Sequence, residues 1–304
     1  MNILYKRVLF FIILITVTVN NLSACDLCGC SSGNYFLGPS PQFGREFIGL
    51  RYSFRSFKTV LANDNKQYSN DFYQTTELWG GFKIKRKIEI LAFVPFNINR
   101  SSSDDGVKST QGLGDITVIC NYNLVNNESL CKDTTTMSQR FAIGAGVKVP
   151  TGKFSVDPAD IVTSANNQSG TGSFDFLFST SYSVIHDKWG LTSELSYKIN
   201  QSASDYKFGN RFDAAAFAFH SFHKKENTIS PNVGLLYENL NPNQLSETDV
   251  PSTGGYALLG AMGVESRFDK ITAGFNIQYP LLENISDGQT KINLRGMLHL
   301  TYAF

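Results

Sequence analysis

The sequence predicts an all-β fold, an antiparallel transmembrane β-barrel of about 12 strands, from three observations. The last fourteen residues, Lys291 to Phe304, alternate between apolar and polar side chains, as in a strand with lipid on one side and water on the other. Most segments with strand character are eleven to fifteen residues long, against a usual length of about five or six. The mean hydropathy is −0.14, and after the N-terminal run no apolar stretch reaches the roughly 18 residues of a membrane helix. A soluble β-sandwich also alternates, but the segment length favours the barrel.

Twelve segments have strand character, and an even number suits a closed bacterial barrel. They cover residues 44–57, 70–84, 88–100, 113–124, 139–150, 172–185, 189–199, 211–222, 228–240, 254–268, 271–280 and 290–304. The connections after the even-numbered segments are mostly short and charged, which predicts periplasmic turns. The others are longer and polar and are predicted as outer loops: 61–68, 101–112, 151–171, 200–210 and 241–253. Residues 125–138 are the exception, a long connection on the short-turn side, and the loop 151–171 is long enough to fold inward as a constriction.

The N-terminus predicts export of the chain. Lys6 and Arg7 precede an apolar run, residues 8–19, that is too short to span a bilayer but suits a signal peptide over residues 1–24. The tetrapeptide Leu-Ser-Ala-Cys that ends at Cys25 resembles a bacterial lipobox, so Cys25 is a candidate for lipidation; ordinary cleavage after Ala24 is the alternative. Residues 25–43 are then a cysteine-rich periplasmic segment, and residues 44–304 a single barrel domain, because no linker or charge block divides them.

The C-terminus resembles an assembly signal. A final Phe304, with Tyr302 two residues before it, is similar to the end of many Gram-negative outer-membrane barrels. The predicted localisation is therefore the outer membrane of a Gram-negative bacterium, with outer-membrane lipid and the barrel assembly machinery as partners. The 24 Phe and 13 Tyr suit interfacial aromatic girdles, and a net charge of +1 argues against nucleic acid as a partner.

Alternation also predicts which charged side chains face the lumen. The residues assigned to the lumen wall are Arg51, Arg55, Glu77, Lys83, Glu89, Asp115, Lys148, Asp175, Glu194, Lys198, Glu238, Glu265, Arg267, Lys291, Arg295 and His299. Such charges either pair across strands and stiffen the wall or line a wet path, and the first interpretation is favoured. Because both signs are mixed, weak ion selectivity at most is expected.

Three cysteines open the mature chain, and their role is open between three interpretations. Cys25, Cys28 and Cys30 could share a soft metal ion such as Cu or Zn. With Cys25 acylated, Cys28 and Cys30 could form a disulfide or bind such an ion alone, and simple oxidation in the periplasm without a ligand is the third possibility. Residues 31–43 are either a periplasmic lead-in or a plug in the lumen. Cys120, on a lipid-facing position, and Cys131 are predicted to be isolated.

Nothing in the sequence favours catalysis. Neither a Gly-x-Ser-x-Gly elbow nor a His-Glu-x-x-His helix is present, and proximity of His299 to one of many hydroxyl groups is expected by chance. The protein is therefore predicted not to be an enzyme, and no cofactor is certain.

One ordered set of short motifs resembles a known family. Gly112-Leu113-Gly114-Asp115 is followed by a strand pair, by the segment 148–152 (Lys-Val-Pro-Thr-Gly), and by a Gly-Thr-Gly at 170–172 before an aromatic strand. This order is similar to the bacterial outer-membrane family named for the meta-pathway of phenol degradation. The resemblance implies a channel or transporter for small, aromatic or hydrophobic molecules. The alternative function is a closed-lumen structural or docking protein whose cysteine cluster binds a metal or a periplasmic redox partner.

Overall fold

The computed structural model describes residues 46–60, 68–85, 87–104, 106–127, 137–155, 165–225 and 227–304. Its main sheet comprises β1 (Phe47–Val60), β2 (Tyr68–Lys85), β3 (Ile88–Ser103), β4 (Gly106–Leu113), β5 (Ile116–Asn126), β6 (Ser138–Val149), β7 (Asp175–His186), β8 (Trp189–Ile199), β11 (Arg211–His220), β12 (Phe222–Lys224), β13 (Asn227–Leu240), β16 (Gly255–Phe268), β17 (Ile271–Ile285) and β18 (Thr290–Ala303). Strands β4 and β5 both pair with β3, and β11 and β12 both pair with β13, so these fourteen strands occupy twelve positions around the sheet.

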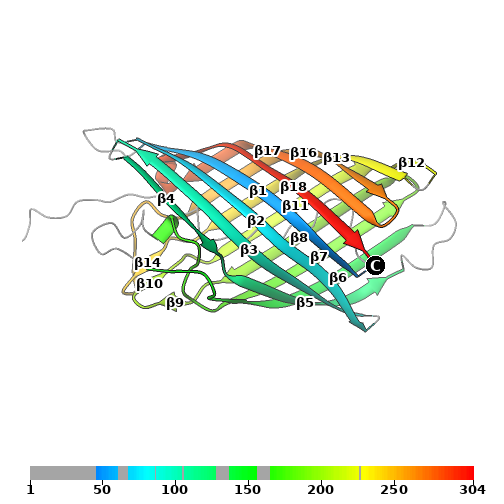
Figure 1. Ribbon diagram of the computed structural model, residues 1–304, viewed down its shortest axis with the longest axis horizontal. Helices are drawn as coiled ribbons and strands as arrows, with labels where there is room; N and C mark the ends of the chain where they lie inside the picture. The colour runs from blue at the N-terminus through cyan, green and yellow to red at the C-terminus, as the bar shows by residue number, and fades with distance from the viewer. Residues whose placement is uncertain are drawn as a thin grey trace, which may run out of the picture.

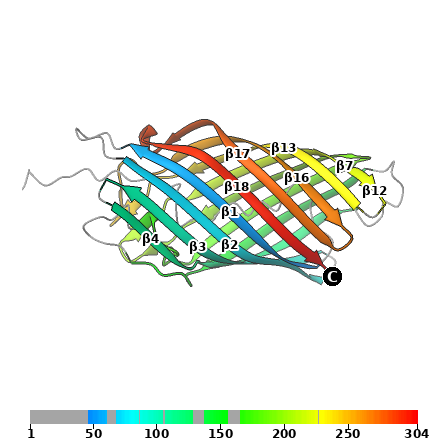
Figure 2. The same ribbon diagram turned by 45° about the horizontal axis from the view of Figure 1, so that its top comes forward.

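The sheet closes on itself as an antiparallel barrel. Neighbouring strands pair in chain order, and the ring is completed where β1 pairs with β18, with Phe47 opposite Ala303. The strands run steeply tilted around a long, narrow body (Figures 1 and 2). Closure leaves no strand of the main sheet as an open edge. The prediction of a twelve-stranded antiparallel barrel is confirmed.

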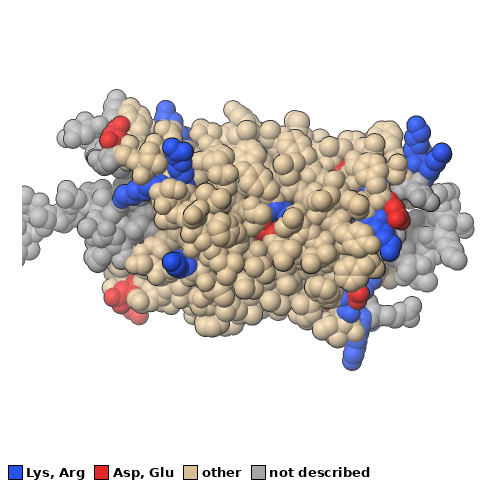
Figure 3. All heavy atoms as spheres, viewed as in Figure 1, with Lys and Arg blue, Asp and Glu red and all other residues tan. Residues whose placement is uncertain are grey.

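The outer face is apolar. Along β7 the side chains of Phe176 and Phe178 are exposed while that of Asp175 is buried, and the same alternation recurs in β1 and β8. Figure 3 shows a broad middle band almost without charged side chains, with Lys and Arg gathered near the two ends. A band of this kind is what lipid requires of the outside of a membrane barrel.

The two ends of the barrel differ. Both Phe47 and Phe304 lie at the end where short connections join β2 to β3, β7 to β8, and β16 to β17. At the opposite end, two loop hairpins form a separate small sheet from β9 (Ser202–Ala203), β10 (Tyr206–Lys207), β14 (Gln244–Leu245) and β15 (Thr248–Asp249). Tyr206 and Phe208 pack there with the buried Ala165. The predicted outer loops 200–210 and 241–253 therefore contain paired strands. No helix among the described residues is long and apolar enough to cross a membrane.

Several boundaries differ from the sequence prediction, and three of them are instructive. The segment 101–112 is mostly strand rather than loop, because β3 continues to Ser103. Residues 96–103 of β3 pair with β4 over the whole length of β4. Nearly all β4 side chains are exposed and most are polar, so no apolar alternation marked this hairpin. Strand β7 begins at Asp175 rather than at 172, and β17 continues to Ile285 past a bulge. The long connection between β5 and β6 lies on the short-turn side, but residues 128–136 are outside the described residues.

The alternation of the last strand does slip once. Ser56 pairs with Leu294 and the next residue, Phe57, pairs with Ile292, so one residue is bulged in β18. A bulge exchanges the two faces of a strand beyond it. Ile292 is therefore buried, and the side chain of Lys291 is 56% exposed. The prediction that Lys291 lines the lumen is wrong for this reason.

Candidate functional site in the barrel lumen

Most predicted lumen residues are buried on the inward face of the barrel. The buried members are Arg51, Glu77, Glu89, Asp115, Lys148, Asp175, Lys198, Glu238, Glu265, Arg295 and His299. Arg55, Lys83 and Glu194 are partly buried, and Arg267 is exposed near the short-turn end of β16. Cations and anions are mixed around the wall, and most of them meet in ion pairs. The wall is therefore mainly a set of cross-strand ion pairs.

The Gly-Leu-Gly-Asp motif provides an acceptor for an inward-folded loop. Asp115 follows β4, where the chain steps from β4 into β5. One carboxylate oxygen accepts the backbone N–H of Gly152 at 2.9 Å. The other accepts the N–H of Thr171 at 2.8 Å, its hydroxyl at 2.9 Å and the Lys148 ammonium at 2.9 Å. Three segments far apart in sequence therefore converge on one buried carboxylate.

Lys148 links this carboxylate to a second one. Its ammonium lies 2.5 Å from Asp175 Oδ2 and also donates to the Thr171 hydroxyl. Asp175 in turn accepts the Ser173 hydroxyl at 2.8 Å and the N–H of Gln201 at 3.0 Å. A buried ammonium is tolerable because two carboxylates surround it, and the carboxylates because several N–H and O–H groups donate to them. We call Asp115, Lys148, Thr171 and Asp175 the loop anchor.

The loop anchor holds residues 165–174 against the inner wall. The amide of Asn97 donates to Ser169 O at 2.8 Å, and that of Asn99 donates to Gln168 O at 2.8 Å. Gly152 and Gly170 are in backbone contact, since a Cβ on Gly170 would lie 2.6 Å from the carbonyl carbon of Gly152. Only glycine allows this approach. The motif residues that carried the family resemblance thus build one structure, which fixes an outer loop inside the barrel mouth.

A second cluster lies further along the lumen, on β1, β2 and β3. Arg51 is hydrogen-bonded to Glu77, and its guanidinium lies 5.3 Å from the ring centre of Trp79 and 5.5 Å from that of Phe93. Phe47 packs edge-on against Trp79 with ring centres 4.7 Å apart. The arrangement places a paired cation over two aromatic rings, and because the rings are 2% and 1% exposed the cluster is packed into the inner wall.

A third cluster is centred on Glu238 of β13. Arg295 Nη1 donates to both carboxylate oxygens at 2.8 Å, and Arg211 Nη2 lies 3.3 Å from one of them. Arg211 Nε also donates to Asp213 at 2.7 Å. Arg211 and Asp213 were missed because the alanine-rich segment 211–222 gave no clear alternation. Arg211 and Asp213 lie an even number of residues from the inward-facing Phe217, and this spacing was the only sign in the sequence that they face the lumen.

Two further pairs of side chains lie on the inner wall. Arg140 Nη2 donates to Glu89 at 2.8 Å, and Arg140 Nε donates to Asn123 at 2.6 Å. Arg140 was also missed, although it has the same parity in β6 as Lys148. His299 Nε2 lies 3.7 Å from Glu265 Oε2 and stacks edge-on against Trp79.

The cysteine predictions fall largely outside the described residues. Cys25, Cys28, Cys30 and Cys131 all lie there, so the metal, disulfide and lipidation hypotheses remain predictions. Cys120 is exposed and unbridged on the outer face of β5. Within the described part of the chain, no three His, Cys, Asp or Glu side chains are grouped as metal ligands would be.

Comparison with known proteins gives one family and several barrels. The model of the family described as "Putative MetA-pathway of phenol degradation" matches residues 57–275. No curated protein matches the chain in sequence. The COG4313 outer membrane channel from Pseudomonas putida F1 has the same fold, with a TM-score of 0.62 at 16% identity over 90% of this chain and 99% of that one. The translocator domain of the autotransporter NalP from Neisseria meningitidis gives 0.44 at 10% identity, over 88% and 91% of the two chains. The β-domain of the Bordetella autotransporter BrkA gives 0.47 at 10% identity, over 86% and 100%.

Proposed function

Because the chain belongs to the family described as "Putative MetA-pathway of phenol degradation", we propose that it is a passive channel for small molecules in a Gram-negative outer membrane. The fold is that of an outer-membrane channel. Passage of solute, its direction and its chemical class are the parts that we propose.

The inward-folded loop 165–174 carries the proposal. A purely structural barrel has no need to hold an outer loop inside its mouth with a buried ammonium and two buried carboxylates, an arrangement that is costly unless complete. A channel uses such a loop as a constriction that sets the size of the solute. We therefore assign the loop anchor a gating or sieving role rather than a catalytic one.

The aromatic cluster around Arg51 supports a small aromatic solute as cargo. Trp79 and Phe93 are stacked, with ring centres 6.3 Å apart, on the inner wall beside the Arg51 guanidinium. Both rings are packed into the wall, with Trp79 2% and Phe93 1% exposed, and the neighbouring ion pairs offer donors and acceptors to a phenol-like hydroxyl group. The family description agrees with this class of cargo.

A closed-lumen docking protein is the second candidate, and a specific observation favours it. Inward-facing Phe57 and Tyr73 belong to one buried apolar cluster that continues through β18, β17, β16 and β13 to Phe217 of β11. Buried apolar side chains along this part of the inner wall take up space in the lumen. On this hypothesis the cysteine segment, rather than the lumen, contacts the partner.

Single-channel recording separates the two candidates. The refolded mature chain and a chain that starts at Ser31 are each inserted in a planar bilayer, and liposomes with the same proteins are tested for uptake of phenol and of a sugar of similar size. Discrete conductance steps with either chain, and faster uptake of phenol than of the sugar, are expected. Steps only in the shorter chain would identify the N-terminal segment as a plug. No steps and no uptake with either chain would contradict the channel proposal.

A further inference from the structure

We propose that the lumen wall formed by β1, β17 and β18 holds a binding subsite for the carboxylate group of a small organic anion, with Arg55 and Arg295 as its cationic groups. This inference rests on the proposed channel function and deepens it, because it names a class of solute and the place where that solute is held.

A cavity marks the place. It has a volume of about 70 Å³ and is lined by Arg55, Arg295, Gln278, Thr75 and Ser53, with the Arg51–Glu77 pair at its margin. One water molecule needs about 10–15 Å³ of such space, so several water-sized groups fit. The strand register brings the lining together, since Arg295 is directly opposite Arg55 on one side and Gln278 on the other.

Arg295 presents an unused binding edge. The residue is 3% exposed, and only its Nη1 reaches Glu238. Its Nε and Nη2 atoms are buried and have no hydrogen-bond partner among the residues that the structure describes. These two N–H groups point the same way from the planar guanidinium and form the edge that carboxylates bind with two parallel hydrogen bonds. The Phe57 ring, 5.4 Å from the guanidinium carbon, keeps that plane in position.

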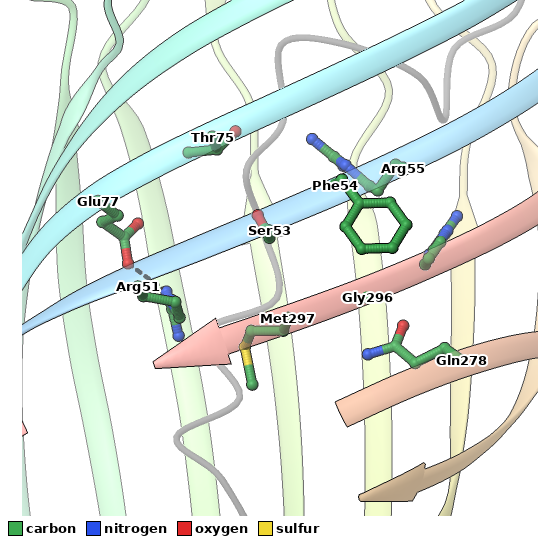
Figure 4. A pocket seen from close by; sticks show the side chains of 10 residues that line it. Arg51, Ser53, Phe54, Arg55, Thr75, Glu77, Gln278, Gly296 and Met297 are labelled. Carbon is green, nitrogen blue, oxygen red and sulfur yellow. Dashed lines mark hydrogen bonds and ion pairs between the residues drawn. The ribbon is translucent and has the colours of Figure 1, made fainter. Parts of the chain in front are cut away.

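Arg55 adds a second cation, which forms no ion pair with a described residue. Among the described residues no carboxylate lies within 4.0 Å of its guanidinium. Figure 4 shows the Arg51 side chain joined to Glu77, whereas none of the other residues drawn is joined to Arg55. Like charges directly opposite on neighbouring strands are destabilising, so the placement of Arg55 against Arg295 has a cost in the empty barrel. A bound anion removes that cost.

A carboxylate suits the site better than a cation or a neutral group. Two guanidinium groups repel a cation. A neutral amide has one oxygen atom, so it cannot offer a separate acceptor to each of Arg295 Nε and Nη2. The Gln278 amide, which donates to Asn276 at 3.1 Å, borders the same space, and Met297 supplies an apolar wall for the rest of the solute. A small aromatic carboxylate satisfies both parts.

The test is calorimetric binding to the full mature barrel, refolded in detergent at low ionic strength. Benzoate is the probe, benzamide its neutral counterpart, and inorganic phosphate a competing anion. Saturable binding of benzoate and not of benzamide is expected. Arg55→Gln and Arg295→Lys should each raise the Kd for benzoate about tenfold or more, because each loses a charge-assisted hydrogen bond. Arg295→Lys keeps the charge beside Glu238, so the barrel should still fold. Lys291→Gln, on the same strand but exposed, is the matched control and should leave the Kd unchanged.

Each other outcome overturns the proposal. Absence of saturable benzoate binding, equal binding of benzamide, or an unchanged Kd in both arginine variants would remove the subsite. Tighter binding of phosphate than of benzoate would refute the choice of a carboxylate. Conductance is recorded on the same preparations. Intact conductance without benzoate binding would contradict this inference alone. Benzoate binding without conductance would contradict the channel proposal alone.

Discussion

Replacing Asp115 with Asn should release the loop 165–174 from the inner wall. The carboxylate accepts four hydrogen bonds, three of them on one oxygen from Thr171 and Lys148. An amide has one acceptor and one donor group, so in either orientation its NH₂ faces an N–H that now lacks an acceptor. A hydrogen bond to a charged group contributes about 1.5–3 kcal/mol, and breaking a buried ion pair costs about 3–5 kcal/mol. We expect the loop to lose about 3–5 kcal/mol of anchoring.

Amide hydrogen exchange measures this loss directly. About 3 kcal/mol corresponds to a rise of 100-fold or more in the open population, so peptides covering 165–174 should exchange about 100-fold faster in Asp115→Asn. Peptides from β13 and β16 should be unaffected, because their ladders lie elsewhere in the barrel. Asp187→Asn, the same substitution in an exposed turn at the other end, is the control. Unchanged exchange of 165–174 in a folded Asp115→Asn barrel would show that the loop anchor does not hold the loop.

Three further predictions concern packing and assembly. Trp79→Ala should lower the free energy of unfolding by about 3–5 kcal/mol, because Trp79 is 2% exposed in the lumen cluster. Trp189→Ala, at a site that is 65% exposed, should lower it far less, and denaturant titration compares the two variants. Gly170→Ala should speed exchange of the inward loop because its Cβ collides with backbone, while Gly260→Ala, with only ordinary side-chain contacts, should not; equal exchange in the two variants would contradict the close approach. Deletion of Phe304 should slow insertion of the barrel in cells, measured as the heat-modifiable folded band, if the C-terminal assembly signal is correct; normal insertion would argue against it.

The strand pattern was readable from the sequence because lipid and lumen impose a period of two on every strand. Segments with a clear apolar face, such as 172–185 and 189–199, were placed to within a few residues. The pattern failed where the outer face leaves the lipid, as in the polar hairpin of β3 and β4, and where a bulge changes the parity, as at Lys291. The first event removes the apolar alternation, and the second leaves the alternation intact on the other face, so alternation detects neither.

The sequence by itself determined the barrel, its two unlike ends, most of the charges that turn inward, and the motifs that belong to the family. Only the tertiary structure decided which charge meets which. Asp115, Lys148 and Asp175 come from separate strands, and their pairing depends on strand tilt and on the path of the loop 165–174. The unused edge of Arg295 is likewise invisible in a sequence, because it depends on which of its nitrogen atoms reaches Glu238. Alternation specifies a face for each side chain, whereas partners are set by register, height and rotamer.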